Sequence, residues 1–310
     1  MTNYKILFSA PYMIPFLDRF RPELESHGLE LIVPLVQERL SEEALMEYAG
    51  EIDGTICGDD RYSERVLQAY APRLKVISKW GTGIDSIDQE AARRLGIQVR
   101  NTPNAFTTAV ADTVLGYLLA FTRQQPWMDR AVKAGEWRKI PGCTLSERTL
   151  GVVGVGNIGK AVIRRARAFG MKVYGTDIVP IDHVFLTESG VEMTTLETLL
   201  QYSDFVSLNC DLNPTSYHLI NAHTLGLMKS SSVLINTARG PIVDEAALIH
   251  ALQQRIIAGA ALDVFEAEPL PADSLLLKLD QVMLAAHNAN SSPAAWERVH
   301  RNTIKNLLDG

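Results

Sequence analysis

The sequence predicts an α/β fold with two doubly wound parallel-sheet domains, each covered by helices on both faces. Short apolar segments alternate with capped helical segments along nearly the whole chain, which is typical of parallel sheets. The chain of 310 residues also exceeds what one hydrophobic core usually supports, so two domains are expected.

The first hundred residues predict the first sheet. Strands are expected at 5–10, 29–35, 52–58, 74–81 and 97–101, and helices at 15–28, 41–50, 63–72 and 86–96. Gly28 and Gly50 are typical helix stops, and Ser41 is a typical N-cap residue. This alternation is that of an α/β domain in its own right.

A linker is expected at 101–103, where Pro103 interrupts the pattern and two lobes could hinge. A long apolar helix then begins near Ala105 and continues to about residue 121. Apolar side chains lie around much of its circumference. We therefore expect this helix to be buried, either between the domains or in a dimer interface.

The alternation of strands and helices then resumes and predicts a second sheet. Its segments are 149–156, 157–170, 171–177, 195–204, 205–210, 221–229, 231–238, 244–256, 257–265 and 281–286. A last helix, with Ser292 at the N-cap and Pro293 at its first position, cannot extend this sheet and is expected on the first domain. The predicted domains are 1–100 plus 291–310, and 101–290 inserted between them.

Composition excludes several classes of protein. The net charge of −6 gives no electrostatic reason to bind nucleic acid or anionic lipid. No apolar run approaches the ~20 residues that span a bilayer, and the N-terminus lacks a signal-peptide pattern. Cys57, Cys143 and Cys210 form no C-x-x-C pair, which favours a reducing, cytoplasmic compartment. His218 and His223 have no matching acid or thiol cluster, so no metal site is expected.

A glycine motif, Gly154-x-Gly156-x-x-Gly159, lies between an apolar strand and a helix. Gly154 permits a tight turn, Gly156 lets the backbone approach a pyrophosphate, and Gly159 lets the helix pack closely on the strand. The helix start, at Asn157 and Ile158, would offer backbone N–H groups to the phosphates. These features predict a Rossmann- or flavodoxin-like domain that binds a dinucleotide.

Asp177 ends the next predicted strand, near the spacing expected for an acid that binds a ribose. A carboxylate there accepts hydrogen bonds from the ribose 2′-OH and repels a 2′-phosphate. Ile178, Val179 and Pro180 follow, and they supply no arginine for such a phosphate. We therefore predict NAD, in preference to NADP, as the cofactor.

Charged residues follow three later strands of the second domain. Arg239 follows one strand, Asp263, Glu266 and Glu268 follow the next, and His287 follows the last. Because parallel strands end at one crevice, these side chains are expected to lie together. An arginine there would bind a carboxylate, a histidine would exchange the proton that accompanies hydride transfer, and an acid would orient the imidazolium. Singly, each residue also fits a surface ion pair or a solvated turn.

The chain resembles the D-2-hydroxyacid dehydrogenase family over nearly its whole length. The matching motifs are VVGVGNIGK, NTARGPIVDEAAL, ALDVFEAEPLP and the histidine after VMLAA. The resemblance implies that Arg239 is the catalytic arginine, that Glu268 pairs with the histidine, and that His287 is the acid/base. It also implies a cofactor domain inserted in a substrate domain, and a homodimer formed through the cofactor domain.

The same resemblance implies further cofactor contacts. Asp263 matches an aspartate that contacts the nicotinamide amide, and Thr237 and Ala238 line the cofactor beside Arg239 and His287. The stretch after VSL departs from the family pattern, because many members have histidine and proline where this chain has Asn209 and Cys210. We expect this change to alter the floor of the adenine or ribose pocket and to leave the chemistry unchanged.

The stretch SKWGTGIDSID resembles the family's substrate loop, and most closely that of phosphoglycerate dehydrogenases. Backbone N–H groups of Gly81, Thr82 and Gly83 would bind a substrate carboxylate as an anion nest. Lys79 stands where those enzymes carry a basic residue, although a solvated lysine at a strand end is the alternative. Trp80 is expected either to shape the pocket or to pack under the loop.

The residues after the strand at 52–58 leave a phosphorylated substrate undecided. Gly58 stands where phosphoglycerate dehydrogenases often have an arginine, and Asp59 and Asp60 would repel a phosphate. Arg61 would offset part of that repulsion. We favour a small 2-hydroxy or 2-oxo acid as substrate.

We therefore expect an NAD-dependent oxidoreductase that interconverts a small D-2-hydroxy acid and its 2-oxo acid. One rival is a non-catalytic NAD(H)-sensing protein, which would not need Arg239, Glu268 and His287 together. A second rival is a dehydrogenase of the same fold for another substrate, such as formate or phosphonate. The sequence specifies neither the acid nor the physiological direction.

Overall fold

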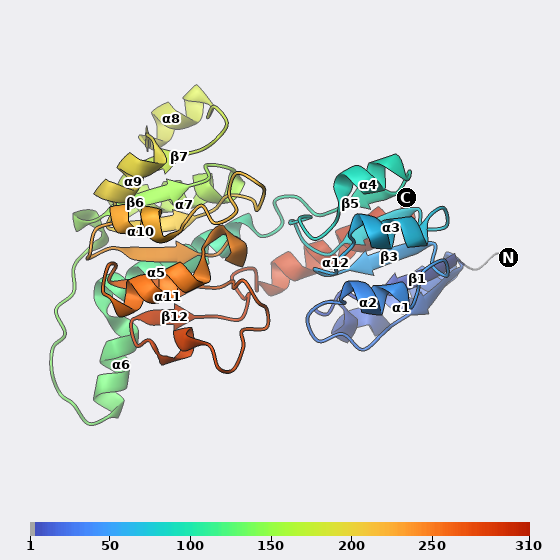
Figure 1. Cartoon of the computed structure of the whole chain (residues 1–310), viewed down its shortest axis with the longest axis horizontal. Helices are drawn as coiled ribbons and strands as arrows, with labels where there is room; N and C mark the ends of the chain where they lie inside the picture. The colour runs from blue at the N-terminus through green and yellow to red at the C-terminus, as the bar shows by residue number, and fades with distance from the viewer. Residues whose placement is uncertain (1–3) are drawn as a thin grey trace. The chain divides into compact units, whose positions relative to one another are not determined.

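The computed structural model describes residues 4–310, which divide into two compact units. The first unit runs to Phe106 and is completed by Ser291–Gly310, whereas the second unit is Thr107–Asn290. The second unit is thus inserted in the first. Both units are α/β, as predicted (Figure 1).

The first unit contains a five-stranded parallel sheet in the order β2-β1-β3-β4-β5. Its strands are β1 (Tyr4–Phe8), β2 (Leu29–Ile32), β3 (Gly54–Cys57), β4 (Val76–Lys79) and β5 (Gln98–Arg100). Its helices are α1 (Leu17–Ser26), α2 (Glu42–Met46), α3 (Glu64–Tyr70), α4 (Gln89–Arg94) and α12 (Pro293–Leu308), with a 3-10 turn, η1 (Ile14–Phe16). Ser41 caps α2 by accepting from the Ala44 N–H, which is why this short helix begins there.

The last helix, α12, packs against β3 and β4 of the first unit and is drawn in red beside the blue strands of Figure 1. Ser292 caps α12, and Pro293 takes its first position. The Ser78 hydroxyl of β4 donates to the Thr303 carbonyl across 2.7 Å, in a fully buried contact. The end of the chain therefore completes the core that its beginning starts.

The second unit contains a seven-stranded parallel sheet in the order β12-β11-β10-β9-β6-β7-β8. Its strands are β6 (Thr149–Val153), β7 (Lys172–Thr176), β8 (Glu192–Met193), β9 (Phe205–Leu208), β10 (Val233–Asn236), β11 (Gly259–Leu262) and β12 (Val282–Leu284). Strands β9, β10 and β11 are buried along their whole length, because helices cover both faces.

Two layers of helices cover this sheet. The helices are α5 (Thr107–Arg123), α6 (Gln125–Lys133), α7 (Asn157–Ala168), α8 (His183–Ser189), α9 (Leu196–Tyr202), α10 (Ala222–Leu227) and α11 (Glu245–Gln253). The remaining short turns are η2 (Leu145–Glu147), η3 (Gly240–Ile242) and η4 (Leu275–Lys278). Helices α5 and α7 share one apolar core, and α9, α10 and α11 share the other.

Helix α5 corresponds to the apolar helix that we expected between domains or in a dimer interface. Much of its apolar surface, including Val114, Leu118 and Phe121, is buried in the core of its own unit against α7 and the sheet. The sequence of α5 alone does not predict its packing on α7, because α7 begins far along the chain, at Asn157. Within residues 4–310, no helix combines the length and apolar character needed to cross a membrane.

Candidate active site

The glycine motif forms the tight turn between β6 and α7. Gly154 has φ +88°, and a Cβ atom there would lie 2.6 Å from the Cys210 backbone nitrogen. A Cβ atom on Gly159 would lie 2.0 Å from the Gly154 carbonyl oxygen, so α7 touches the turn directly. Around Gly156, by contrast, a Cβ atom would meet nothing within 4 Å. The turn is thus closed on its protein side and open on its outer side.

This open side fits the pyrophosphate of a dinucleotide. Gly156 occupies the N-cap position of the twelve-residue helix α7, and no side chain caps the helix there. The following residues, Asn157 and Ile158, open the helix, where the helix dipole favours an anion. Both Gly156 and Asn157 are exposed, so a phosphate can approach.

Asp177 lies directly after β7 and is held by the backbone. Its carboxylate accepts from the Val155 N–H at 2.6 Å and from the Val179 N–H at 3.1 Å. The side chains of Ile178 and Val179 are exposed beside it. The carboxylate is therefore fixed next to the glycine turn. Residues 178–181, which follow it, contain no lysine or arginine.

Three further residues that we expected near the cofactor differ in their surroundings. The Thr237 hydroxyl, just after β10, is buried and has no hydrogen-bond partner among residues 4–310. An unpartnered buried hydroxyl at this edge fits a ligand that would complete it. Ala238 is half-buried and donates to the Asn236 side chain. The Asn209 amide instead turns back to Ser207, donating to its carbonyl at 3.0 Å.

His287 and Glu268 lie in contact. The imidazole Nδ1 is 3.1 Å from Glu268 Oε2, and the other carboxylate oxygen accepts from the Phe265 N–H at 2.9 Å. The two side chains are 21% and 17% exposed, which leaves them accessible to a small molecule. His287 has φ +47°, a left-handed conformation that is costly for a residue with a Cβ atom.

Asp263 holds this strained histidine in place. Its carbonyl accepts from the His287 N–H at 2.8 Å, and its carboxylate oxygens accept from the N–H groups of Asn288 and Ala289 at 2.8 and 2.9 Å. Burial raises the pKa of Asp263, and these two hydrogen bonds oppose the rise. The sequence pattern gave no sign of this anchoring role.

Arg239 follows β10 on the neighbouring loop. Its guanidinium donates to the Ala238 carbonyl at 2.9 Å, and its own carbonyl accepts from Asn236 at 2.9 Å. A Cβ atom on the next residue, Gly240, would lie 1.9 Å from the Phe265 carbonyl carbon. The loop that carries Arg239 therefore packs directly on the loop that carries Glu268, which is bonded to His287.

A second histidine–glutamate pair lies on these loops and was missed from the sequence. His218 Nε2 is 2.7 Å from Glu266 Oε1, and the ring of Tyr217 stacks on His218. The Glu245 carboxylate accepts from the Glu266 N–H, and burial beside Glu266 raises the pKa of Glu245. The two neighbouring glutamates thus have different partners, His218 for Glu266 and His287 for Glu268.

The proposed substrate loop lies in the first unit, after β4. Gly81 has φ +119°, and its carbonyl accepts from the Thr102 N–H at 2.8 Å. The Thr82 hydroxyl donates to the Thr102 carbonyl at 3.0 Å, and Gly83 is half-buried. Within the described part of the first unit, residues 4–106 and 291–310, the backbone N–H groups of Gly81, Thr82 and Gly83 make no hydrogen bond, which fits an anion nest.

Lys79 and Trp80 precede this loop and are both buried. The side chain of Lys79 is 5% exposed, so the alternative of a solvated lysine is wrong. Its ammonium donates to the Trp80 carbonyl at 2.9 Å and pairs with Asp59 at 3.1 Å. Trp80 donates from its indole N–H to His300 Nδ1 at 2.9 Å, so it packs under the loop against α12.

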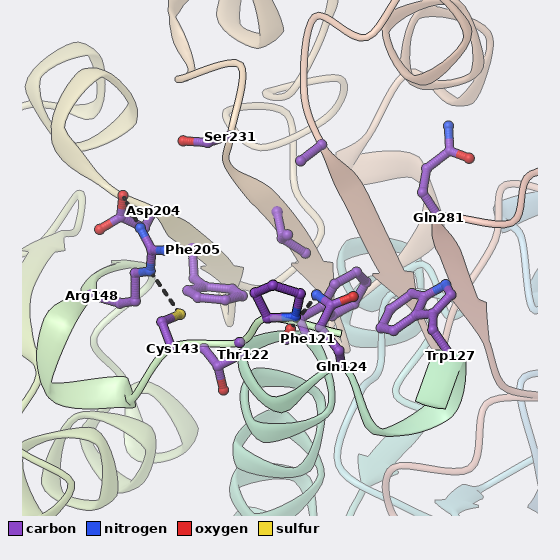
Figure 2. Close-up of a pocket in the computed structure, with 14 residues that line it drawn as sticks. Phe121, Thr122, Gln124, Trp127, Cys143, Arg148, Asp204, Phe205, Ser231 and Gln281 are labelled. Atoms are coloured by element: carbon purple, nitrogen blue, oxygen red, sulfur yellow. Dashed lines mark hydrogen bonds and ion pairs between the residues drawn. The ribbon is translucent and has the colours of Figure 1, made fainter. Parts of the chain in front are cut away.

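A cavity of about 480 Å³ opens at the opposite edge of the second sheet, where the strands begin (Figure 2). Its lining includes Phe121, Trp127, Cys143, Arg148, Asp204 and Gln281. Its charged groups have partners, because Arg148 donates to the Cys143 sulfur at 3.0 Å and Asp204 pairs with Lys229 at 3.0 Å. None of the predicted site residues lines this cavity.

Comparison with known proteins agrees with this geometry. Residues 115–289 match the model of the family "D-isomer specific 2-hydroxyacid dehydrogenase, NAD binding domain". A glyoxylate reductase from Thermofilum pendens is 41% identical over 86% of this chain and 81% of its own. A D-3-phosphoglycerate dehydrogenase from Methanocaldococcus jannaschii is 39% identical over 87% of this chain and 52% of its own.

A solved structure extends the likeness to three dimensions. The D-lactate dehydrogenase of Aquifex aeolicus, complexed with NAD and lactic acid, has a TM-score of 0.86 against this chain. The two chains are 29% identical, and the match covers 97% of this chain and 93% of the other. The chain therefore belongs to the D-isomer specific 2-hydroxyacid dehydrogenase family and is an NAD-dependent oxidoreductase.

Proposed function

We propose that this enzyme reduces a small 2-oxo acid with NADH, and oxidises the D-2-hydroxy acid in reverse, with His287 as its acid/base. The observation that carries the proposal is the 3.1 Å contact between His287 Nδ1 and Glu268 Oε2, in a loop that Asp263 fixes from beneath. Such an acid–imidazole pair is suited to proton exchange near neutral pH.

The pairing assigns a role to each nitrogen of His287. Glu268 holds the Nδ1 side of the ring, and we assign the exchange of a proton with substrate to Nε2. In oxidation Nε2 takes the hydroxyl proton, and in reduction it returns a proton to the carbonyl oxygen. The Glu268 carboxylate stabilises the imidazolium in both directions. The bound nicotinamide supplies or accepts the hydride.

Arg239 and the loop at 81–83 are proposed to hold the substrate. A guanidinium binds a carboxylate through two parallel hydrogen bonds and polarises a neighbouring carbonyl. The N–H groups of Gly81, Thr82 and Gly83 offer donors for an anion. Lys79 is assigned no direct contact, because its ammonium is already bonded to Asp59 and to the Trp80 carbonyl.

The preference for NAD over NADP rests on Asp177. Two backbone N–H groups fix its carboxylate beside the glycine turn, where it would accept from a ribose 2′-OH. A 2′-phosphate at that place would meet a negative charge. Gly154, Gly156, Asn157, Ile158 and Gly159 would hold the pyrophosphate.

The test is a panel of 2-oxo acids with NADH and NADPH in parallel. Glyoxylate, hydroxypyruvate and pyruvate come first, since similar proteins are named for reactions of such acids. We expect NADH oxidation with at least one of them and a higher kcat/KM for NADH than for NADPH. Tight NADH binding without turnover of any acid would favour an NAD(H)-sensing protein instead.

We also propose that the enzyme is a cytoplasmic homodimer. Trp137, in the second unit, is 94% exposed, and tryptophan is enriched at interfaces between proteins. Light scattering during gel filtration would test this, and a mass near the 34.2 kDa of one chain would contradict it.

A further inference from the structure

We infer that Asp59 makes the substrate loop of the first unit select unphosphorylated 2-oxo acids over phosphorylated ones. The inference rests on the proposed function, because it assumes that residues 81–83 receive the substrate carboxylate. It assigns a specificity role to a residue outside the expected catalytic set. The observations that carry it all lie in the first unit.

Lys79 is the cation that lies against this loop. A Cβ atom on Gly81 would be 3.5 Å from the Lys79 Nζ atom, so the ammonium stands directly beside the turn. Its side chain is 5% exposed, which shields its charge from the counter-ions of the solvent. A lysine in this place would attract a second anionic group on the substrate if its charge were uncompensated.

Asp59 compensates that charge. Asp59 Oδ1 lies 3.1 Å from Lys79 Nζ, and the Asp59 side chain remains 31% exposed. The pairing follows from the sheet register, since Cys57 of β3 aligns with Lys79 of β4 and Asp59 comes two residues later. A ligand beside the loop therefore meets an ion pair whose acidic member faces solvent.

Asp60 adds a second acid behind this pair. It is fully buried and accepts hydrogen bonds from the Ser9 hydroxyl and the Leu40 N–H. Burial raises the pKa of Asp60 to about 6, so the carboxylate is mostly ionised above neutral pH. Arg61, the next cation along the loop, is exposed and its charge is screened by solvent.

The balance of charge separates two classes of substrate. A small 2-oxo acid brings one carboxylate, which the 81–83 loop is proposed to bind. A phosphate ester adds roughly two negative charges at neutral pH. Those charges would meet Asp59, where Lys79 is already neutralised. Removing one repelling carboxylate near a dianion is worth about tenfold in affinity at a partly exposed site.

The experiment compares hydroxypyruvate with 3-phosphohydroxypyruvate, using NADH and the full chain. The variants are Asp59→Asn, which removes the charge, and Asp59→Glu, which keeps it. Asp18→Asn is the matched control, because the Asp18 side chain is 98% exposed on α1 of the same unit. We expect the wild type to prefer hydroxypyruvate and Asp59→Asn to raise the relative kcat/KM for the phosphorylated acid about tenfold. Asp59→Glu and the control should keep the wild-type preference.

Equal turnover of both acids by the wild type, or an unchanged ratio in Asp59→Asn, would overturn the inference. Calorimetric titration of D-glycerate and D-3-phosphoglycerate into NAD-loaded protein reads the same selectivity without turnover. If no acid is turned over but the binding ratio still responds to Asp59→Asn, the proposed function fails and the inference stands. If neither acid binds, both fail.

Discussion

The carboxyl edges of the two sheets carry charged groups in opposite states. On the second sheet, His287 and Glu268 are paired yet 21% and 17% exposed, so a ligand can reach them. On the first sheet, Lys79 is 5% exposed and Asp60 is fully buried. The comparison shows how one architecture serves two purposes. The pair that is proposed to exchange protons is accessible, whereas Lys79 and Asp60 are buried and hydrogen-bonded within the protein.

The largest expected effect follows from removing the accessible imidazole. Asparagine tolerates a left-handed backbone better than most residues, so His287→Asn should keep the loop at φ +47°. We expect kcat to fall by about 10³-fold, because a general acid/base typically contributes 10²- to 10⁴-fold. NADH binding, followed by fluorescence, should remain unchanged. A variant that retains more than a tenth of the wild-type kcat would remove His287 from the mechanism.

Next in size is the loss of the carboxylate that stabilises the imidazolium. Glu268→Gln should lower kcat/KM by about 10- to 100-fold. In reduction, His287 must start protonated, so the rate falls as rising pH removes that proton. Without the carboxylate the imidazolium is less stable, and the fall should move to lower pH. Glu266→Gln is the matched control, since Glu266 contacts His218 and should leave the pH profile in place.

A smaller effect is expected from the anchor beneath the histidine. In Asp263→Asn one carboxylate oxygen becomes an NH₂ group that faces a backbone N–H of Asn288 or Ala289. The lost hydrogen bond and the new clash of donors should cost about 1–3 kcal/mol in stability. We expect a lower melting temperature. We also expect a roughly tenfold lower kcat, because a small displacement of His287 from its position would slow the reaction. Unchanged values would show that the loop keeps its shape without Asp263.

The smallest expected effect concerns the buried acid of the first sheet. Because the pKa of Asp60 rises to about 6 from 3.8, the native state binds its proton more tightly than the unfolded chain does. Stability from this group is therefore present below pH 4 and is lost as pH rises through about 6. Asp60→Asn should remove that dependence and stabilise the protein by about 1 kcal/mol at pH 7.5. Melting temperatures at pH 5 and pH 7.5, with Asp18→Asn as control, measure this, and a retained pH dependence would contradict it.

Local patterns predicted most of the fold. Most strands and helices lie where the sequence indicated, although α6, α8 and β8 were not predicted, and the glycine spacing placed the turn between β6 and α7. Contacts between distant segments could not be predicted in the same way. Lys79 and Asp59 meet because β3 and β4 pair in one particular register. Helix α5 is buried because α7 lies beside it. The spacing of apolar residues within one segment predicts neither this packing nor the contact between Lys79 and Asp59.

Some residues of the candidate site were predicted from the sequence and others were not. Arg239 and His287 were predicted because each follows a strand and the ends of parallel strands gather at one edge. Glu268 was chosen over Glu266 from the resemblance to the family. The role of Asp263 as an anchor was not predictable, since it acts on backbone N–H groups that every residue has. The His218–Glu266 pair was missed because its members lie 48 positions apart on separate loops.

The order of synthesis gives α12 a further significance. Ser78 and Trp80 bond to Thr303 and His300, so the first unit lacks these buried partners until the last helix has been made. The second unit is continuous in the chain and needs no later segment of this kind. On the ribosome, the first unit is therefore expected to mature only after α12 has been translated, whereas the second unit can fold earlier.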